Sequence, residues 1–393
     1  MRWVRIMSLS LLGVLLLGGT FLVGYQVGDH GGAAARAAGP GFEILWRVRD
    51  LLSASFIGDV PPVQQQVYGA ARGLASSYND PFTVFVEPVG RKIEREELQG
   101  HFGGIGASLT RNEKGEVTLA VLPDRPAARA GVLDGDILLE VDGKAVTAEM
   151  TIQNVVELVR GDVGTTAKLL IRRMSQDAPL ALSVVRERID TPSVEWRLAD
   201  PATHTGYLKV SLFTERTGEE LKTGIADLAG KGVDKVVLDL RGNGGGLVDA
   251  AVQVVSQFLL DGTVLREQKR GGQERFYPVS GVKGPAQDWP IAVLVDGGTA
   301  SASEIVAGSL RDNGRAVLVG EKTYGKGSVQ EVHELPDGSS LHVTVARWFT
   351  PNRHQIDKTG LLPDVAVVAT AQDRSAGRDT PLLRAEAWLH GDR

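Results

Sequence analysis

The chain has 393 residues, of which 42% are hydrophobic and 23% charged, and its formal net charge is −5 at pH 7. This length predicts two or three domains, and the negative charge, with no long basic run, argues against nucleic acid as a partner. Because the chain has no cysteine, it has no disulfide, no thiolate nucleophile and no cysteine-ligated zinc. Its seven histidines are scattered and form no HExxH motif, so we expect no metal and look for an oxygen nucleophile.

The N-terminus predicts a membrane anchor. After Arg2 and Arg5, residues 6–27 carry no charge over 22 residues, enough for about 30 Å of helix. The two arginines place this end in the cytoplasm and the rest of the chain outside it. A cleaved signal peptide is the alternative, but the apolar run is long for one and the small residues near Ala37 lie far beyond its end. We therefore expect a signal anchor over residues 1–30, followed by a small-residue linker over 31–41.

Residues 42–98 form a predicted helical arm. The segments 42–56 and 62–78 both have apolar residues at helical spacing. An arm of this size is too short to bury its own apolar faces, so we expect it to pack on the rest of the chain or on another subunit.

Residues 99–188 predict a small β-rich module. Short strands alternate with glycine and Asp-Gly turns, and two helices are expected, over 126–131 and 151–161. From 189 to 370, strand and helix patterns alternate, which predicts a largely parallel sheet with helices on its faces. The tail, 371–393, holds one more expected helix over 381–389.

The segment "GEKTYGKGS", residues 320–328, looks like a phosphate-binding loop. Such a loop needs a Ser or Thr after its lysine and a helix next, whereas here Gly327 follows Lys326 and the alternating, valine-rich "GSVQEVHEL" predicts a strand. We therefore expect no nucleotide, and Lys326 needs another explanation.

Three loops leave the carboxyl ends of predicted parallel strands, and such ends share the edge of the sheet where ligands bind. They are the glycine loop 242–246, the serine-containing segment 296–305 and the lysine-containing segment 321–330. Ser301 or Ser303 lies at a strand-to-helix turn, where the next amides have no helical partner and can receive an oxyanion. A lysine can act as the base for a serine when burial lowers its pKa. Period-two spacing places Gln330 on the same face as Lys326.

Each of these features has an ordinary structural interpretation as well. A serine at a helix start is commonly an N-cap, and a lysine in a glycine loop is commonly solvated. The glycine loop does not match the G-x-G-x-x-G spacing of a dinucleotide site, because Leu247 breaks it. Because all three loops converge on one edge of the predicted sheet, we favour the interpretation that they form a catalytic site.

Residues 299–330, "TASASEIVAGSLRDNGRAVLVGEKTYGKGSVQ", closely resemble the core signature of the carboxyl-terminal processing peptidases, which are tail-specific serine proteases. The resemblance extends over about residues 60 to 368. It implies an α/β multidomain protein with a ClpP/crotonase-like βαβ peptidase core over 189–370 and a PDZ domain inserted at 99–188. Gly244 stands where many members have Pro, and Asp296 where many have Asn.

The resemblance also implies roles for individual residues. Ser301 is the expected nucleophile, Lys326 its base and Gln330 the residue that supports the base, with no cofactor. Asp312 matches an acidic position sometimes grouped with the dyad, although we expect it to brace the helix end. The expected oxyanion hole consists of the amide of Ala302 and one from the stretch Gly245 and Gly246. The PDZ loop that captures a substrate carboxylate matches Phe102, Gly103, Gly104 and Ile105.

Together these features predict a serine endopeptidase that recognises free protein C-termini and cuts near them, on the outer side of a bacterial cytoplasmic membrane, or secreted if the anchor is cleaved. The alternatives are a catalytically silent PDZ scaffold, which should have lost the Ser or the Lys, and a trypsin-like PDZ protease, whose PDZ domain normally follows the catalytic domain. We also expect a homodimer or higher oligomer built from the arm, 42–77, and the tail helix, 382–389, because both carry apolar faces that no adjoining sequence covers.

Overall fold

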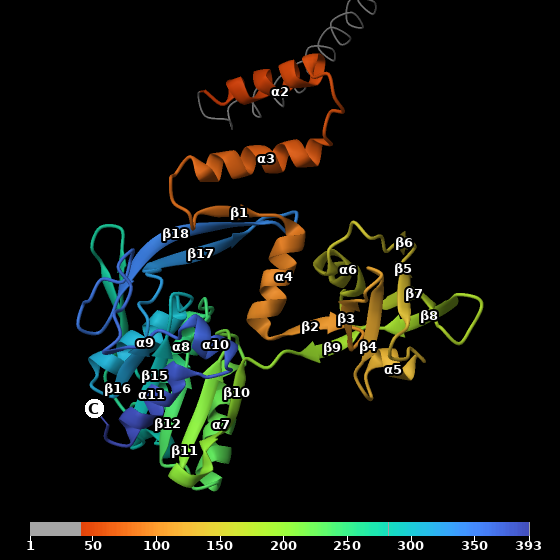
Figure 1. The fold of residues 1–393 in the computed structure, drawn as a ribbon. Helices are drawn as coiled ribbons and strands as arrows, with labels where there is room; N and C mark the ends of the chain where they lie inside the picture. Colours follow the sequence, from red (N-terminus) through yellow and green to blue (C-terminus); the bar gives the residue numbers. More distant parts are fainter. Residues whose placement is uncertain (1–40, 282, 393) are drawn as a thin grey trace, which may run out of the picture. The chain divides into compact units, whose positions relative to one another are not determined.

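A computed structural model describes residues 41–281 and 283–392 (Figure 1). Its contacts divide the chain into two units, one ending at Ala71 and the other beginning at Arg72. The predicted anchor over residues 1–30 lies outside the described residues. Within the described ranges, no helix has the length and apolar character needed to span a membrane.

The arm contains the two expected helices, α2 (Glu43–Ser55) and α3 (Val63–Ser76). The residues of α2 are all exposed, including the large apolar side chains of Ile44, Trp46 and Leu52. Val67 of α3 is also exposed. The arm therefore presents apolar surface that its own helices do not cover.

The last part of the predicted arm, after α3, forms strand β1 (Val84–Val86) and helix α4 (Pro88–Gln99), which were not expected as separate elements. Pro88 occupies the first turn, where its missing N–H is not needed. Gly100 ends α4 with a left-handed φ of 69°, a conformation that glycine adopts without strain. From this residue the chain enters the β-rich module.

The β-rich module is a five-strand antiparallel sheet of order β3-β4-β5-β7-β8, with β6 added beside β5. The short helix α5 (Pro126–Arg129) and the longer α6 (Ile152–Val159) are the two helices expected from the sequence. Val117, Leu119, Leu138 and Ile171 are fully buried in its core. Chain enters and leaves the module through the paired strands β2 and β9. The strands are β2 (His101–Gly104), β3 (Ala107–Arg111), β4 (Val117–Val121), β5 (Ile137–Val141), β6 (Lys144–Ala145), β7 (Thr166–Arg172), β8 (Leu180–Val185) and β9 (Glu187–Asp190).

The following region is built on a sheet of order β10-β11-β12-β15-β16-β19, in which every pair except β10-β11 is parallel. Side chains alternate between its faces: Val236 and Leu238 pack with α7, α8 and α9, whereas Val237 packs with α11. The strands are β10 (Val194–Asp200), β11 (Thr205–Val210), β12 (Lys235–Asp239), β15 (Ile291–Val295), β16 (Ala316–Gly320) and β19 (Val365–Ala366). The helices are α7 (Thr217–Gly230), α8 (Val248–Ser256) and α9 (Ala302–Asp312). The expected parallel sheet is thus present.

A second, antiparallel sheet, of order β1-β18-β13-β14 with β17 beside β18, was not expected. The sequence reading extended strand-helix alternation over the whole of 189–370, but β13 (Thr263–Lys269), β14 (Glu274–Pro278), β17 (Ser328–Glu334) and β18 (Ser340–Phe349) form hairpins instead. The segment after Lys326 is the predicted strand, β17. The overall class, mixed α/β, is the one expected.

The tail ends in α10 (Ala371–Ser375) and α11 (Thr380–Leu389). Helix α11 packs on the sheet, with Ala385 fully buried and Leu382 and Trp388 against the same cluster. The expectation that the tail helix has an uncovered apolar face is therefore wrong, because this face covers the chain's own sheet. In the arm, by contrast, both helices carry large apolar side chains that are exposed.

Candidate active site

Ser301 lies at the sharp turn between β15 and α9. Its backbone has φ 55° and ψ −116°, a left-handed value that is uncommon for a residue with a side chain. The turn places it directly before the first helical residue, Ala302. Ser303, the other candidate nucleophile, is fully buried and donates its hydroxyl to the carbonyl of Asn243 at 2.9 Å. Ser301 is therefore the serine available for chemistry.

Glu304 joins the serine turn to the lysine loop. One of its carboxylate oxygens accepts hydrogen bonds from the backbone N–H groups of Ser301 and Lys326, at 3.0 and 2.9 Å. The other accepts from the N–H of Gly325 at 2.8 Å and from the hydroxyl of Thr323 at 2.5 Å. Burial raises the pKa of the Glu304 carboxyl, and these four hydrogen bonds act in the opposite direction.

The sequence reading did not single out Glu304. Its signal was the spacing Ser-x-x-Glu at a helix start, which is the pattern of a capping box. In the structure the carboxylate spans two loops, so it does more than cap α9. It fixes the backbone of the candidate nucleophile and that of the candidate base to the same oxygen.

The side chain of Lys326 is half-buried. Its Nζ lies 4.7 Å from the centre of the Phe82 ring, and its backbone carbonyl accepts a hydrogen bond from Trp348 at 3.0 Å. Burial lowers the pKa of Lys326, although the charges of Glu94 and Asp80 oppose this. Among the hydrogen bonds of the described residues, none joins this ammonium to Ser301.

The glycine loop 242–246 passes directly over Ser301. A Cβ on Gly245 would lie 2.8 Å from the Cβ of Ser301 and 3.1 Å from the amide nitrogen of Ala302, so only glycine fits there. The N–H of Gly245 already donates to the side chain of Asn243 at 2.9 Å. Of the two expected glycines, Gly245 therefore has its N–H already engaged within the loop.

Gln330 does not contact Lys326 in the structure. Its amide nitrogen donates to the hydroxyls of Ser328, at 2.8 Å, and Thr344, at 3.3 Å. Lys326 precedes β17, and the pairing of β17 with β18 shifts by a bulge between Val329 and Gln330. The extra residue at this bulge, Val345, belongs to β18, so counting fails because Lys326 lies outside the strand to which period-two spacing applies.

Asp312 lies at the opposite end of α9 from Ser301. This helix has 11 residues and is about 16 Å long. The carboxylate accepts a hydrogen bond from the backbone of Asn352 at 2.9 Å and contacts His354 at 3.2 Å. Asp312 braces a loop at the helix end, as expected, and takes no part in the arrangement around Ser301.

In the β-rich module, β3 is an edge strand of the sheet and lies beside α6. An edge strand facing a helix is suited to bind an extended peptide as an added strand. Phe102, Gly103 and Gly104 lie in β2 and pair with β9, so only Ile105 of the four expected loop residues lies in the β2–β3 connection. The ring of Phe102 lies 4.0 Å from the guanidinium of Arg160.

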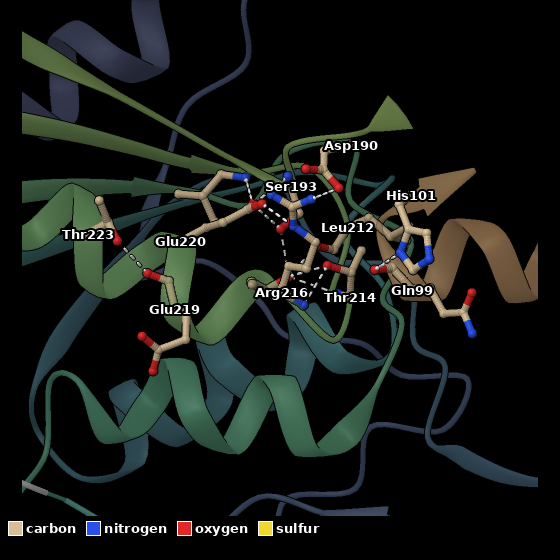
Figure 2. A network of polar contacts seen from close by, with 12 residues as sticks. Gln99, His101, Asp190, Ser193, Leu212, Thr214, Arg216, Glu219, Glu220 and Thr223 are labelled. Atoms are coloured by element: carbon tan, nitrogen blue, oxygen red, sulfur yellow. Dashed lines mark hydrogen bonds and ion pairs between the residues drawn. The ribbon is translucent and has the colours of Figure 1, made fainter. Parts of the chain in front are cut away.

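A polar network lies where the β-rich module joins the region that follows it (Figure 2). Arg216, immediately before α7, forms ion pairs with Asp190 at the end of β9 and with Glu220, the latter at 2.9 Å. Glu220 also accepts hydrogen bonds from the backbone and hydroxyl of Ser193, at 2.7 and 2.8 Å. These charged groups hold the strand that leaves the module.

Comparison with known proteins agrees with this organisation. Residues 204–367 match the model of peptidase family S41, and residues 117–173 match that of the PDZ domain. A carboxy-terminal-processing protease of Bartonella bacilliformis is 36% identical over 337 residues, which cover 84% of this chain and 76% of that protein. A carboxyl-terminal-processing protease of Picosynechococcus is 34% identical, over 81% of this chain and 77% of that protein.

A solved structure, of a putative S41 protease from Bacteroides fragilis, shares the fold. It matches with a TM-score of 0.50 and 18% identity, over 86% of this chain and 93% of that one. The sequence relatives are closer and cover most of their own length as well as most of this chain. By these matches the chain belongs to the carboxy-terminal-processing proteases, serine proteases of peptidase family S41 that carry a PDZ domain.

Proposed function

We propose that this protease is an endopeptidase with a Ser-Lys dyad, in which Ser301 is the nucleophile and Lys326 the general base. The observation that carries the proposal is the carboxylate of Glu304, which binds the backbone N–H groups of both residues through one oxygen. The burial of Lys326 supports it further, because it favours the neutral amine that a base requires.

In the proposed reaction, neutral Lys326 takes the proton from the hydroxyl of Ser301 as its oxygen attacks the peptide carbonyl. The negative oxygen of the tetrahedral intermediate is received by the amides of Ala302 and Gly246. The peptide C–N bond then breaks, and Lys326 returns its proton to the leaving amine. Water attacks the resulting ester with Lys326 again as base, which releases the second product and restores Ser301.

This reaction requires the side chain of Lys326 to turn from the Phe82 ring toward Ser301. Catalytic hydrogen bonds are often absent or long without substrate, so a resting geometry of this kind is compatible with a dyad. The backbone of Lys326 is already fixed by Glu304, and only side-chain torsions need to change.

We further propose that the PDZ module binds the free C-terminus of a protein substrate along the β3 edge and that the chain is anchored by its N-terminal segment, with the protease domain outside the cytoplasmic membrane. The open edge of β3 beside α6 supports the first part. The uncharged run at 6–27 after two arginines supports the second. The exposed apolar faces of the arm support an assembly of two or more copies.

The test is cleavage of an unstructured protein, followed by mass spectrometry of the products. Ser301→Ala and Lys326→Ala should each abolish cleavage and leave the melting temperature unchanged, because a dyad loses function as a unit. Lys326→Arg should fail as well, since a guanidinium stays protonated. Lys322→Ala, an exposed lysine in the same loop, should retain wild-type activity. Activity in either alanine variant of the dyad would refute the assignment.

A further inference from the structure

The C-terminal tail is joined to the start of the glycine loop by an ion pair. Arg241, the residue before this loop, donates from its two terminal nitrogens to both carboxylate oxygens of Asp379, each at 2.8 Å. The same guanidinium binds Asp239, with distances of 2.9 and 2.5 Å. A single side chain therefore connects the end of β12, the glycine loop and a tail residue 138 positions later.

The carboxylates of Asp239 and Asp379 both bind the guanidinium of Arg241 in a favourable geometry. Asp239 is buried and also accepts the phenol proton of Tyr207 at 2.7 Å. Burial opposes the charge of Arg241, but its hydrogen bonds to Asp379 and Asp239 raise its pKa above the ordinary value. The hydrogen bonds from Arg241 in turn lower the pKa of Asp379. Planar two-point pairing of this kind fixes direction as well as distance.

On the tail side, Asp379 is fixed by the helix that it begins. Its carboxylate accepts a hydrogen bond from the backbone N–H of Leu382 at 3.1 Å, which caps α11. Helix α11 in turn packs on the sheet through Leu382, Ala385 and Trp388 (Figure 1). The carboxylate that binds Arg241 is thus held by a docked helix.

On the loop side, few residues separate Arg241 from the reacting centre. The N–H of Gly242 donates to Asp296 at 2.9 Å, and the carbonyl of Asn243 accepts from the N–H of Ala300 at 3.0 Å. Two residues further on, Gly245 lies against Ser301. A displacement of Arg241 would reach the amides beside Ser301 through this short, bonded segment.

We propose that Asp379 is a positioning residue for the oxyanion hole, because by holding Arg241 it sets the glycine loop 242–246 against Ser301. The proposal rests on the proposed function, in which Gly246 and Ala302 receive the oxyanion. It assigns to the tail a part in catalysis in addition to covering the sheet.

The decisive variant is Asp379→Asn, because asparagine also caps helices but lacks the charge that binds Arg241. A lost charge-assisted bond of this type corresponds to about a tenfold fall in kcat, with KM changed less than about twofold. A peptide boronic acid, which forms a tetrahedral adduct on the serine oxygen, should bind about tenfold more weakly by the same reasoning. If Asp379 only stabilised the fold, its replacement would not lower kcat and the boronic acid affinity together while leaving KM unchanged.

Asp373→Asn is the matched control, since Asp373 is a tail carboxylate that contacts Thr370 and Arg378. This variant should retain wild-type kcat and boronate affinity. Asp379→Glu keeps the charge, so it should recover part of the loss, and it tests the proposal if the asparagine variant does not fold.

Wild-type kcat and boronate affinity in folded Asp379→Asn would overturn the proposal, as would a loss expressed only in KM. Equal losses in the glutamate and asparagine variants would also overturn it. Failure of the proposed function is recognised separately, because Ser301→Ala would then still cleave. An inactive Ser301→Ala beside a fully active Asp379→Asn would refute the positioning role alone.

Discussion

The ammonium of Lys326 lies 4.7 Å from the centre of the Phe82 ring, and the same lysine donates its backbone N–H to Glu304. Phe82 belongs to the segment between the arm and β1, far from the peptidase core in sequence. The proposed base is therefore contacted by residues that precede the PDZ module. An aromatic ring this close to an ammonium favours its charged form.

The pH dependence of cleavage should report the lysine. Because only neutral Lys326 accepts the serine proton, kcat/KM should rise with pH and reach a plateau above the pKa of Lys326, which burial holds below its ordinary value of 10.5. Below that pKa the ammonium cannot act as a base, so activity falls as the solution becomes more acidic. The measurement is kcat/KM for a fluorogenic peptide across the range in which the protein stays folded. A rate that does not change with pH would contradict a lysine base.

Two substitutions of Phe82 should move this profile in opposite directions. Phe82→Leu keeps the site dry but removes the ring that favours the ammonium, so the rise in activity should move to lower pH by roughly half a unit. Phe82→Ala should admit water, which stabilises the ammonium, and move the rise to higher pH.

Tyr78→Leu, at an exposed aromatic residue of the same segment, should leave the profile where it is. An unchanged profile, or a shift to higher pH, in Phe82→Leu would show that the ring does not stabilise the ammonium of Lys326.

Replacing Glu304 should harm both activity and stability. In Glu304→Gln, a single side-chain oxygen remains to accept the hydrogen bonds that two carboxylate oxygens now accept. The NH2 group of the new glutamine side chain would face N–H donors. Unsatisfied buried donors cost about 1–3 kcal/mol each, so we expect a loss of at least about 2 kcal/mol in the free energy of unfolding. We expect kcat to fall by about a hundredfold, because both loops lose their shared acceptor. Urea denaturation and steady-state kinetics would measure the two effects, and a fully active glutamine variant would contradict the bridging role.

Recognition of a free C-terminus should depend on the PDZ module and on its connection to the core. A peptide with a free apolar C-terminus should be cleaved at least about tenfold faster than its amidated form, equivalent to roughly 1.4 kcal/mol. The chains that enter and leave the module are joined where Thr191 donates its N–H to Gly100 at 2.9 Å. Arg216 binds the leaving strand through Asp190.

Arg216→Ala should reduce this preference for the free C-terminus. Peptide binding in the module can affect the core only through the segments that connect them, and Arg216 holds one of these segments through Asp190. Lys222→Ala, on the exposed surface of α7, should preserve it. Equal rates for the free and amidated peptides in the wild-type protein would show that recognition lies elsewhere.

The arm should support self-association. Ile44, Leu45, Val48, Leu51 and Leu52 are all at least 47% exposed, and they lie on one face of α2. Residues 41–393 should therefore behave as a dimer or larger assembly in light scattering at micromolar concentration. Leu45→Glu together with Leu52→Glu should yield monomers, whereas Ser53→Glu, at an exposed residue on the other side of α2, should not. A wild-type monomer at these concentrations would refute the prediction.

Hydrophobic periodicity in the sequence predicted those helices and strands whose apolar residues face a single packing partner. The helices of the arm and of the β-rich module, the parallel strands and the strand after Lys326 were all expected from local patterns. The antiparallel sheet of β13, β14, β17 and β18 was not, because its strands alternate on a half-exposed surface and its two hairpins are joined by β13 and β18 across a long sequence distance.

Side-chain partners were harder to foresee. Glu304 carries a recognisable capping pattern, but three of its four hydrogen bonds come from a loop about twenty residues later. The contact between Phe82 and Lys326 joins residues more than two hundred positions apart, and no local pattern in the sequence predicts it. Gln330 shows the converse problem, since it lies in β17 whereas Lys326 precedes this strand, and period-two counting applies only within a strand.

The folded tail bears on whether the protease can act on itself. A PDZ groove takes its ligand as an extended strand with an accessible end, whereas here the backbone N–H groups of His390 and Asp392 donate back to α11, and Arg384 donates to the carbonyl of Asp392. Residues 380–392 could bind as such a strand only after α11 had left the sheet. The described part of the tail is thus kept in a helical and turn conformation that an extended-strand groove does not accept.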